Sequence, residues 1–511
     1  MKKIYGRILK GCLLALFLAA LLPCEARAER KEIPCGKKVT GTLDTETGLL
    51  VISGKGPMWN NPSREYFGPY QEQIKEVVIQ EGVTTIGDYA FYSGFDLLQK
   101  VTIGKDVHTI GKRSFAYAEG LTDIYIPGTV REIRYEAFQY SGLISCTISP
   151  GVEIIGARAF GDTKLETINI PGTVKEIGEG LFQDSALTSC VLNPGLGVIG
   201  KEAFSGTSLT SVDIPGTVKE IKEGAFRDNG SLAACTFHPG LSVIGSHAFA
   251  NTGLTSVILP EGVTLVGSGA FLIGTLREVE IPRSVQIIQS KAFSVANINV
   301  LSPTVALEDE AFAAGSYLTA DRGTTTEAYV WKTPGRYTLL YRQYEVTMTL
   351  DPNGGTVGNA SRVVRTESFY RSLPEAKRRG YLFAGWYTLP EGGYKVSGGD
   401  RITFPGDFTL YAHWKKAALK ACKKPVVRSG SKGKLRVKIR KVSGAVRYQI
   451  RVSQKPSMKP GKTILTGHTS RNISRLKSGK KYYVQVRGYC LDSMRKRVYG
   501  PWSKKASAVV R

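Results

Sequence analysis

The sequence predicts a mainly β, multidomain protein in which a long repeat solenoid is followed by a small β domain and a β-sandwich. The first observation is a repeat of about 22 residues, which is clearest over residues 165–270. The second is that each repeat contains a short alternation of apolar and polar residues, as in a half-buried strand. The third is that residues 345–511 contain further alternating runs separated by turn residues. A fixed period in the twenties indicates a solenoid, and 511 residues are too many for one domain.

Residues 1–28 have the features of a signal peptide. A basic start precedes an apolar run at 13–22, and Ala26-Arg27-Ala28 forms a small-x-small site, so we expect cleavage after Ala28. The apolar run is too short to span a bilayer stably. Cys24 leaves a lipoprotein anchor open, although Pro23 directly before it fits that motif poorly. An uncleaved anchor helix is a further alternative.

Residues 29–73 do not carry the repeat. Two alternating runs flank Thr47-Gly48, which predicts a hairpin. Because no earlier repeat covers the first layer of a solenoid, this segment is expected to be an N-terminal cap.

The repeats are expected over residues 74–315, and each follows the pattern Leu-x-x-Val-x-Ile-Pro-x-x-Val-x-x-Ile-Gly-x-x-Ala-Phe. In one copy, Val212 and Ile214 point to the core because side chains alternate along a strand. Pro215 then ends the strand, and Phe226 adds a ring to the core. The phenylalanine recurs at Phe91, Phe115, Phe138, Phe160, Phe182, Phe204, Phe226, Phe249, Phe271, Phe293 and Phe312.

This spacing resembles the leucine-rich repeats of the BspA-like class, which is found in bacterial surface proteins. About eleven repeats fit the pattern, and they cover close to half of the chain. The resemblance implies a leucine-rich-repeat solenoid with a cap at each end. It also implies binding of host matrix proteins or of partner bacteria.

Residues 316–344 depart from the repeat and resemble the C-terminal cap of this class. Thr324 and Glu327 form a capping box, in which Thr324 is the N-cap and Glu327 reaches back. We therefore expect a short helix that ends at Thr333, before Pro334.

Three cysteines occupy the inward strand position of alternate repeats, namely Cys146, Cys190 and Cys235. Strands of a sheet lie about 4.8 Å apart, so alternate repeats are nearly 10 Å apart. A disulfide requires Cα atoms within about 7 Å. The three cysteines are therefore predicted to be free core thiols and not a metal cluster. Pairing of Cys422 with Cys490 is left open.

The outward strand positions are expected to form the inner face of a horseshoe. Most of these side chains are small and hydroxylated, and Tyr125 alone is of a type that dominates protein hot spots. Two interpretations stay open: a solvated β-surface without a ligand, and a broad, weak binding surface for protein or glycan. The candidate binding residues are Lys100, Asp123, Tyr125, Thr147, Asn169, Asp213, Thr236, Glu278 and Glu280.

Residues 345–415 are a separate unit. Asn353-Gly354 predicts a turn after a strand. Together with Gly380-Tyr381, Gly385-Trp386 and Tyr411-Ala412-x-Trp414, it resembles the Listeria–Bacteroides repeat, also called the internalin B-repeat. The resemblance implies a small β-grasp-like fold that acts as a spacer or adhesive module. Its aromatic residues are expected to build the core, and sugar stacking by Trp386, Tyr411 and Trp414 is the alternative.

Residues 416–511 contain alternating runs that predict a β-sandwich. Leu476, Gly479, Tyr482 and the closing Tyr-Gly-Pro-Trp-Ser-Lys resemble a fibronectin type III domain. The tryptophan usual on the second strand of that family is missing near residues 439–442.

The net charge of +26 is concentrated in this last segment, because residues 421–511 hold 26 Lys and Arg but one acid, Asp492. Lys434, Arg436, Lys438 and Arg440 alternate with apolar residues and are the candidate polyanion-binding residues. Since an exported protein is expected, the expected partner is an anionic cell-wall polymer, a polysaccharide or lipid headgroups, and not nucleic acid. Charge that only solubilises the protein is the alternative.

No pattern typical of an enzyme or a metal site is present in the sequence. The five histidines are scattered, and Cys235-x-x-His238 is the nearest approach to a metal-binding spacing. Catalysis requires side chains that converge in a cleft, which a repeat surface does not readily supply. We therefore predict no catalytic residues, no cofactor and no metal.

Together these features predict a secreted bacterial protein that associates with the cell surface and acts in adhesion. The solenoid is expected to bind an extracellular protein or glycan. The basic domain is expected to hold the molecule non-covalently on an anionic surface, because the sequence shows no LPxTG-like signal or terminal apolar helix. The alternatives are a secreted glycan-binding protein for polysaccharide capture and a structural wall protein without a specific ligand.

Overall fold

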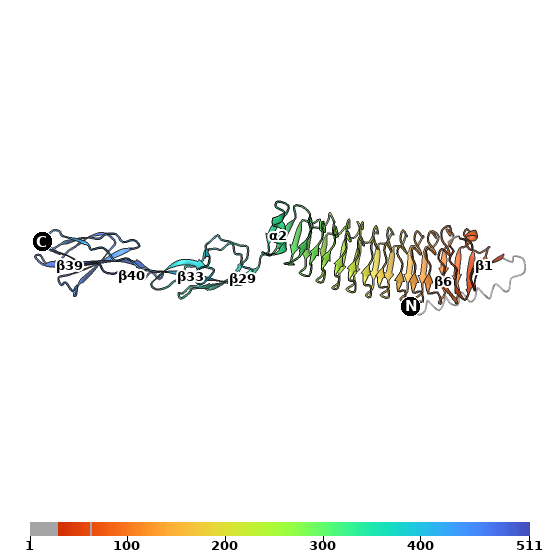
Figure 1. The fold of residues 1–511 in the computed structure, drawn as a ribbon, viewed down its shortest axis with the longest axis horizontal. Helices are drawn as coiled ribbons and strands as arrows, with labels where there is room; N and C mark the ends of the chain where they lie inside the picture. The colour runs from red at the N-terminus through yellow and green to blue at the C-terminus, as the bar shows by residue number, and fades with distance from the viewer. Residues whose placement is uncertain (1–28, 62–63) are drawn as a thin grey trace. The chain divides into compact units, whose positions relative to one another are not determined.

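The computed structural model describes residues 29–61 and 64–511, so the predicted signal peptide lies outside the described residues. The chain divides into two compact units, one up to Tyr341 and the other Arg342–Arg511. The first is a β-solenoid, and the second contains two small β domains (Figure 1). The predicted fold class is confirmed. Within the described ranges, no helix is both long enough and apolar enough to cross a membrane.

The solenoid begins with the hairpin expected around Thr47-Gly48. Strands β1 (Arg30–Gly36), β2 (Val39–Asp44) and β3 (Leu49–Gly54) pair antiparallel in sequence order, and β3 pairs parallel with β5 (Glu76–Ile79). A 3-10 helix, η1 (Gly68–Tyr70), lies between β3 and β5 in the chain. The antiparallel cap therefore passes into the parallel repeats within one sheet.

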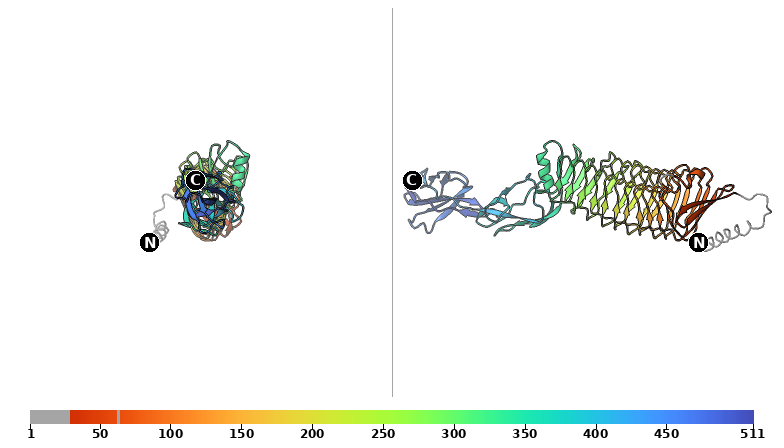
Figure 2. Two further views of the ribbon diagram at one scale, coloured as in Figure 1. Left: turned by 90° about the vertical axis from the view of Figure 1, so that its left-hand side faces the viewer. Right: turned by 45° about the vertical axis from the view of Figure 1, so that its right-hand side comes forward.

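Each repeat contributes one longer strand, which lies in the second half of its Leu-x-x-Val-x-Ile segment. Most neighbouring longer strands pair parallel and in register, and successive strands lie side by side (Figures 1 and 2). After β5 they are β7 (Lys100–Thr102), β9 (Asp123–Ile126), β11 (Ser145–Ile148), β13 (Thr167–Ile170), β15 (Ser189–Leu192), β17 (Ser211–Ile214), β19 (Ala234–Phe237), β21 (Ser256–Ile258), β23 (Glu278–Ile281), β25 (Asn297–Val300) and β27 (Tyr317–Ala320).

A second row of short strands forms one continuous parallel sheet of twelve strands. Most of these strands hold the isoleucine of the Val-x-x-Ile segment, which is buried in the core. The strands are β4 (Gly56–Pro57), β6 (Val83–Ile86), β8 (Thr109–Ile110), β10 (Glu132–Ile133), β12 (Ile154–Ile155), β14 (Glu176–Ile177), β16 (Val198–Ile199), β18 (Glu220–Ile221), β20 (Val243–Ile244), β22 (Leu265–Val266), β24 (Ile287–Ile288) and β26 (Ala306–Leu307).

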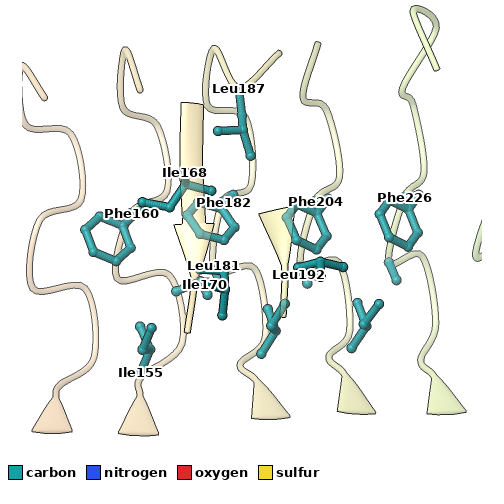
Figure 3. Packing of buried hydrophobic residues seen from close by; sticks show 14 of the residues in the cluster. Ile155, Phe160, Ile168, Ile170, Leu181, Phe182, Leu187, Leu192, Phe204 and Phe226 are labelled. Atoms are coloured by element: carbon teal, nitrogen blue, oxygen red, sulfur yellow. The ribbon is translucent and has the colours of Figure 1, made fainter. Parts of the chain in front are cut away.

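A column of phenylalanine rings runs through the core of the solenoid (Figure 3). From Phe67 to Phe312, neighbouring ring centroids are 5.1 to 6.2 Å apart, and neighbouring rings are within 25° of parallel. The rings of Phe182, Phe204 and Phe226 are fully buried, as the repeat pattern predicted. The column begins at Phe67, which belongs to the cap and which the repeat pattern did not identify.

The turn after the phenylalanine is held by a side chain three residues later. The hydroxyl groups of Ser141, Thr163, Thr207 and Thr252 donate to the carbonyl oxygen of the phenylalanine of their own repeat, at 2.7–3.0 Å. Asn229 takes this role with its side-chain amide. These bonds matter because a buried carbonyl without a partner is destabilising.

The last layer of the solenoid is closed by helix α2 (Thr325–Lys332) and by strand β28 (Thr338–Tyr341), which pairs with β27. The predicted helix start is confirmed, because the hydroxyl oxygen of Thr324 accepts the N–H of Glu327. The Glu327 carboxylate accepts the N–H of Gly323 at 2.6 Å, one residue before the predicted partner. The helix ends before the C-cap residue Thr333, as predicted.

Two tyrosines of this C-terminal cap end the ring column. Tyr329 and Tyr337 meet Phe312 edge-on, with centroids 6.3 and 6.5 Å away. Their hydroxyl groups lie 3.0 Å apart, and the Tyr337 hydroxyl donates to the carbonyl oxygen of Phe312. The cap therefore covers the ring of Phe312 and also provides a hydrogen-bond donor for the backbone carbonyl oxygen of Phe312.

The first domain of the second unit is a mixed five-stranded sheet in the order β30-β29-β33-β31-β32. Its strands are β29 (Glu345–Asp351), β30 (Ser361–Arg365), β31 (Tyr381–Tyr387), β32 (Lys395–Val396) and β33 (Phe408–Lys416). Strands β29 and β33 pair parallel and the others antiparallel. The core contains Met348, Trp386 and Leu410, all nearly or fully buried.

The second domain is a sandwich of two antiparallel sheets. One sheet holds β34 (Val426–Ser429), β35 (Leu435–Lys438) and β38 (Ser470–Ile473). The other holds β36 (Arg447–Ser453), β37 (Lys462–Thr466), β39 (Lys481–Leu491), β40 (Arg497–Tyr499) and β41 (Ala506–Val509). Tyr448 is among the residues that fill the core. The Tyr482 hydroxyl accepts the N–H of Lys477, which ties the turn before β39 to the core.

The cysteines of the solenoid are free thiols, as predicted for Cys146, Cys190 and Cys235. Burial raises the pKa of all three, so they stay protonated and act as small apolar groups. Cys422 and Cys490 are also free, which answers the question that their positions in the sequence left open.

Replacement of a central ring of the column tests how much the column stabilises the solenoid. We expect Phe204→Ala to lower the free energy of unfolding by about 3–5 kcal/mol, because it leaves a cavity between two stacked rings. Chemical denaturation monitored by circular dichroism measures this loss. Tyr125→Ala, at an exposed aromatic residue of the same unit, is the control and should cost less than about 1 kcal/mol. Equal losses for the two variants would contradict the role assigned to the column.

Candidate functional site

The outward side chains of the longer strands form one continuous surface, which we call the strand face. All nine residues predicted for binding lie on it with exposed side chains. They are Lys100 on β7, Asp123 and Tyr125 on β9, Thr147 on β11, Asn169 on β13, Asp213 on β17, Thr236 on β19, and Glu278 and Glu280 on β23. The fold thus orders these residues along the solenoid and does not gather them in one cleft.

Several polar groups of the strand face already have partners. Lys100 forms a salt bridge with Glu76 at 2.7 Å, and Asp213 lies 2.8 Å from a ring nitrogen of His238. The Tyr125 hydroxyl accepts a hydrogen bond from Ser149. These contacts are local, between neighbouring strands or their ends, and leave the apolar parts of the face open.

The most distinctive part of the strand face is a shallow hollow of about 590 Å³ over β21, β23, β25 and β27. Parallel pairing places Ile258, Glu280 and Asn299 in one row, with Ser256, Glu278 and Asn297 in the row beside it. Ile258 is 83% exposed, which is unusual for a large aliphatic side chain. Neither glutamate forms a salt bridge with another described residue.

The strand face continues into the C-terminal cap, beyond the surface predicted from the repeats. Tyr317 on β27 pairs with Asn297, and Leu340 on β28 pairs with Thr319. Both side chains are nearly half exposed. The repeat pattern does not extend to these strands, so only their pairing with β25 and β27 shows that they belong to the face.

Aromatic residues are concentrated at the N-terminal end of the solenoid. A hollow of about 700 Å³ in the N-terminal cap is lined by Trp59, Tyr66 and Tyr70 among others. On the neighbouring turns, Tyr117 and Tyr140 are exposed and stack with their ring centroids 4.8 Å apart. These residues are of the types common in protein interfaces, and they lie outside the strand face.

The repeats match the model of the BspA type Leucine rich repeat region in six copies, over residues 64–189 and 197–319. The solenoid is a BspA-type leucine-rich-repeat domain. This confirms the resemblance read from the Ala-Phe spacing.

Solved structures resemble the BspA-type domain in fold. The pneumococcal vaccine antigen PcpA is 16% identical, with a TM-score of 0.36, and the match covers 62% of this chain and 99% of that chain. A leucine rich cell surface protein from Faecalibacterium prausnitzii is 21% identical, with a TM-score of 0.32, and the match covers 62% of this chain and 96% of that chain. The search of curated proteins found no match.

The domain after the BspA-type solenoid matches the Listeria-Bacteroides repeat domain over residues 344–413. Its aromatic residues serve mainly as core. Trp386 is 2% exposed and donates its ring N–H to the carbonyl oxygen of Pro374. Trp414 is half-buried and donates to the carbonyl oxygens of Pro352 and Asn353. The ring of Trp386 therefore has no free face for a sugar.

The basic sandwich resembles the sixth fibronectin type III domain from human fibronectin type III domain containing protein 3. The two are 18% identical with a TM-score of 0.16, and the match covers 19% of this chain and 88% of that chain.

The four predicted polyanion-binding residues, Lys434, Arg436, Lys438 and Arg440, are all exposed, and we call them the β35 row. The apolar residues between them, Leu435, Val437 and Ile439, are buried. The alternation predicted from the sequence is therefore present. Arg428 lies beside Arg436 on the neighbouring strand and adds to the positive charge.

The single acid of the basic module does not neutralise these cations. Asp492 is 4% exposed, and its carboxylate accepts the backbone N–H groups of Gly380, Met494 and Lys496 at 2.8–3.0 Å. Ser493 makes two more hydrogen bonds with the backbone of Arg378. Asp492 therefore links the sandwich to the Listeria-Bacteroides repeat domain, and the positive charge of the module stays uncompensated.

The described residues show no arrangement that would support metal binding. No group of three or more His, Cys, Asp or Glu side chains in them is placed to hold a metal ion. His238, the residue nearest to a metal-binding spacing in the sequence, lies beside Asp213, while Cys235 faces the core.

Neutralising Asp492 tests the link between the two domains of the second unit. Burial by itself raises the pKa of this carboxyl, but the three N–H donors stabilise the anion and hold its pKa below the ordinary value. A lowered pKa adds stability above the ordinary aspartate pKa of about 3.9, and this stability is lost as the pH falls through the folded-state pKa. We expect Asp492→Asn to lower the unfolding temperature of the second unit by about 2–6 °C at pH 6.

Calorimetry of the full chain between pH 6 and pH 3 measures this difference, which should close as the pH falls below about 4. Glu391→Gln, at an exposed acid of the same unit, is the control and should change nothing. A difference that stays constant with pH would show that Asp492 does not act as a charged acceptor.

Proposed function

We propose that the protein is a secreted adhesion protein that is held on an anionic bacterial surface by its basic sandwich and presents the strand face of its solenoid to an extracellular protein or glycan. The observation that carries this proposal is the separation of charge. Residues 421–511 hold 26 basic residues and one acid, whereas the net charge of the whole chain is +26. Nearly all of the excess charge is therefore in one module.

The structure of the basic module supports its role as an anchor. None of its bases forms a salt bridge with another described residue, and its one carboxylate is engaged by backbone N–H groups. The resulting density of positive charge destabilises the isolated domain through self-repulsion, and it attracts polyanions. An anionic wall polymer or polysaccharide supplies the missing countercharge.

The strand face supports the second half of the proposal. It is continuous over the repeats and carries an open hollow beside the exposed Ile258. The two glutamates in that hollow form no salt bridge with another described residue, although Glu280 accepts a hydrogen bond from Asn299, and they favour a partner with positive or hydrogen-bond-donating groups. The absence of large aromatic platforms on most of the described strand face agrees with weak, extended binding better than with one deep site.

Salt-dependent retention on purified bacterial cell walls tests the anchor. We expect the full chain to bind at 0.05 M NaCl and to dissociate as the salt approaches 1 M, because the Debye length falls from about 10 Å at 0.1 M to about 3 Å at 1 M. The solenoid unit alone, residues 29–341, has its own core and should not be retained. Equal retention of the two proteins would contradict anchoring by the basic module.

Charge reversal on the strand face tests the binding surface. An array of immobilised extracellular-matrix proteins and glycans is probed with the full chain and with Glu278→Arg/Glu280→Arg. On the spots that bind the unmodified chain, we expect binding of the variant to be about tenfold weaker or more. The new arginines would repel the positive groups expected on the partner. The control is Glu119→Arg/Glu179→Arg, which makes the same charge change at exposed turn positions. If the two variants bind alike, the strand face is not the binding surface.

A further inference from the structure

The two sheets of the basic sandwich carry different kinds of positive surface. The core is formed between the sheets, so their outer faces point away from each other. The outer face of β34, β35 and β38 carries the β35 row. The outer face of β36, β39 and β40 carries arginines together with aromatic rings, which no local sequence pattern indicates.

Strand register places the residues of this second face. Arg451 lies opposite Gln485, and Gln449 lies opposite Arg487, so these side chains project from the same side of the sheet. Their neighbours along the strands, Tyr448, Ile450, Val484 and Val486, are buried in the core. Arg451 and Arg487 therefore both face outward from adjacent strands.

Two aromatic rings lie between and beside these arginines. The guanidinium carbon of Arg451 is 4.4 Å from the centre of the Trp502 ring, and that of Arg487 is also 4.4 Å from it. Arg487 lies 4.0 Å from the centre of the Tyr499 ring as well. We call Arg451, Trp502, Arg487 and Tyr499 the arginine ladder.

The ladder holds its guanidinium groups in place. Arg487 is half-buried, and its Nε donates to the side-chain oxygen of Gln449 at 2.7 Å. Stacking on a ring uses the flat face of a guanidinium and leaves its N–H edges available. No further hydrogen bond joins the guanidinium groups of Arg451 and Arg487 to other described residues. Ordered, unused donors are what a bidentate oxyanion site requires.

The β35 row lacks this order. Its one side-chain hydrogen bond joins Arg436 Nε to Ser470 at 3.4 Å, and no aromatic ring lies over any of its four cations in the described structure. Long exposed side chains of this kind attract polyanions as a diffuse field and lose rotamer freedom on binding.

We propose that the arginine ladder is a specific oxyanion-binding site, at which Arg451 and Arg487 bind carboxylate or phosphate groups of an anionic polymer through their planar N–H edges. The inference rests on the proposed anchoring function and assigns its recognition step to the sheet opposite the β35 row. The guanidinium groups cover the ring of Trp502, so a sugar cannot stack on it. The site therefore recognises the ligand through its charged oxygens. The β35 row then adds salt-sensitive attraction without selecting the ligand.

Charge-conserving variants of the full chain test this proposal. Arg451→Lys/Arg487→Lys keeps the net charge and removes the planar forks, and Arg436→Lys/Arg440→Lys makes the same change on the β35 row. The probes are inorganic polyphosphate and polygalacturonate, each titrated at 0.05 M and 0.3 M NaCl. At 0.3 M we expect the ladder variant to bind about tenfold more weakly and the β35 variant to bind within about twofold of the unmodified chain.

The two probes distinguish the sources of the oxyanion. If the ladder variant loses more affinity for polyphosphate, the natural ligand is a phosphate polymer. If it loses more affinity for polygalacturonate, the natural ligand is an acidic polysaccharide. Binding by a folded ladder variant that equals binding by the unmodified chain overturns the proposal and leaves the ladder a purely structural feature. Equal loss in the two variants also overturns it. If the unmodified chain binds neither probe, the proposed anchoring function fails together with this inference.

Thermal unfolding of each variant separates folding from binding. If the double ladder variant does not fold, Arg451→Lys alone is compared with Arg436→Lys, because Arg451 has no hydrogen bond to the rest of the domain that its loss would break. We expect about threefold to fivefold weaker binding for Arg451→Lys and no change for Arg436→Lys.

Discussion

The parallel pairing of successive turns is the constraint on which the rest of the solenoid depends. It sets equal positions of neighbouring repeats about 4.8 Å apart, so each residue packs against its own counterparts. Phenylalanine satisfies this spacing because its flat rings stack, and the column from Phe67 to Phe312 follows. The same spacing restricts the backbone at close approaches. Gly151 adopts a φ of +131°, and a Cβ at this position would collide with the carbonyl oxygen of Gly128 in the neighbouring turn. Cysteines two repeats apart cannot meet, which explains why the inward thiols stay free.

The parts of the fold that depend on local periodicity could be predicted from the sequence. The strands, the buried Phe226, the hairpin at Thr47-Gly48 and the helix start at Thr324 all rest on residues within one repeat or one turn. The ends of the ring column could not be predicted in this way. Phe67, Tyr329 and Tyr337 fall outside the repeat, and only the stacking of the layers places them against Phe91 and Phe312. In the same way, Tyr317 joins the strand face through pairing with β25 and not through a sequence pattern.

The two basic surfaces differ in the same way, because one could be predicted from local sequence and the other could not. The β35 row could be found because its cations alternate along one strand, and alternation is visible in the sequence. The arginine ladder is built from β36, β39, β40 and the segment that follows, so its members are up to 51 residues apart between Arg451 and Trp502. No spacing rule joins an arginine to a ring on another strand. Only the antiparallel register, with Gln449 opposite Arg487, brings these residues together on one face.

The placement of the one acid explains how a module with 26 bases can fold and still keep its charge available. Asp492 does not compensate cations on either sheet; it accepts N–H groups at the junction with the preceding domain. Cation–π attraction to the rings relieves part of the cost of this charge locally, although burial and the nearby Arg451 still lower the pKa of Arg487. This relief is available on the ladder face but not on the β35 row, where the cations are exposed to solvent. One sheet therefore presents arginines stacked on rings with unused donors, and the other presents exposed cations with no ring over them in the described structure. In the proposed anchoring function, the second surface draws an anionic polymer to the module and the first holds the polymer at fixed positions.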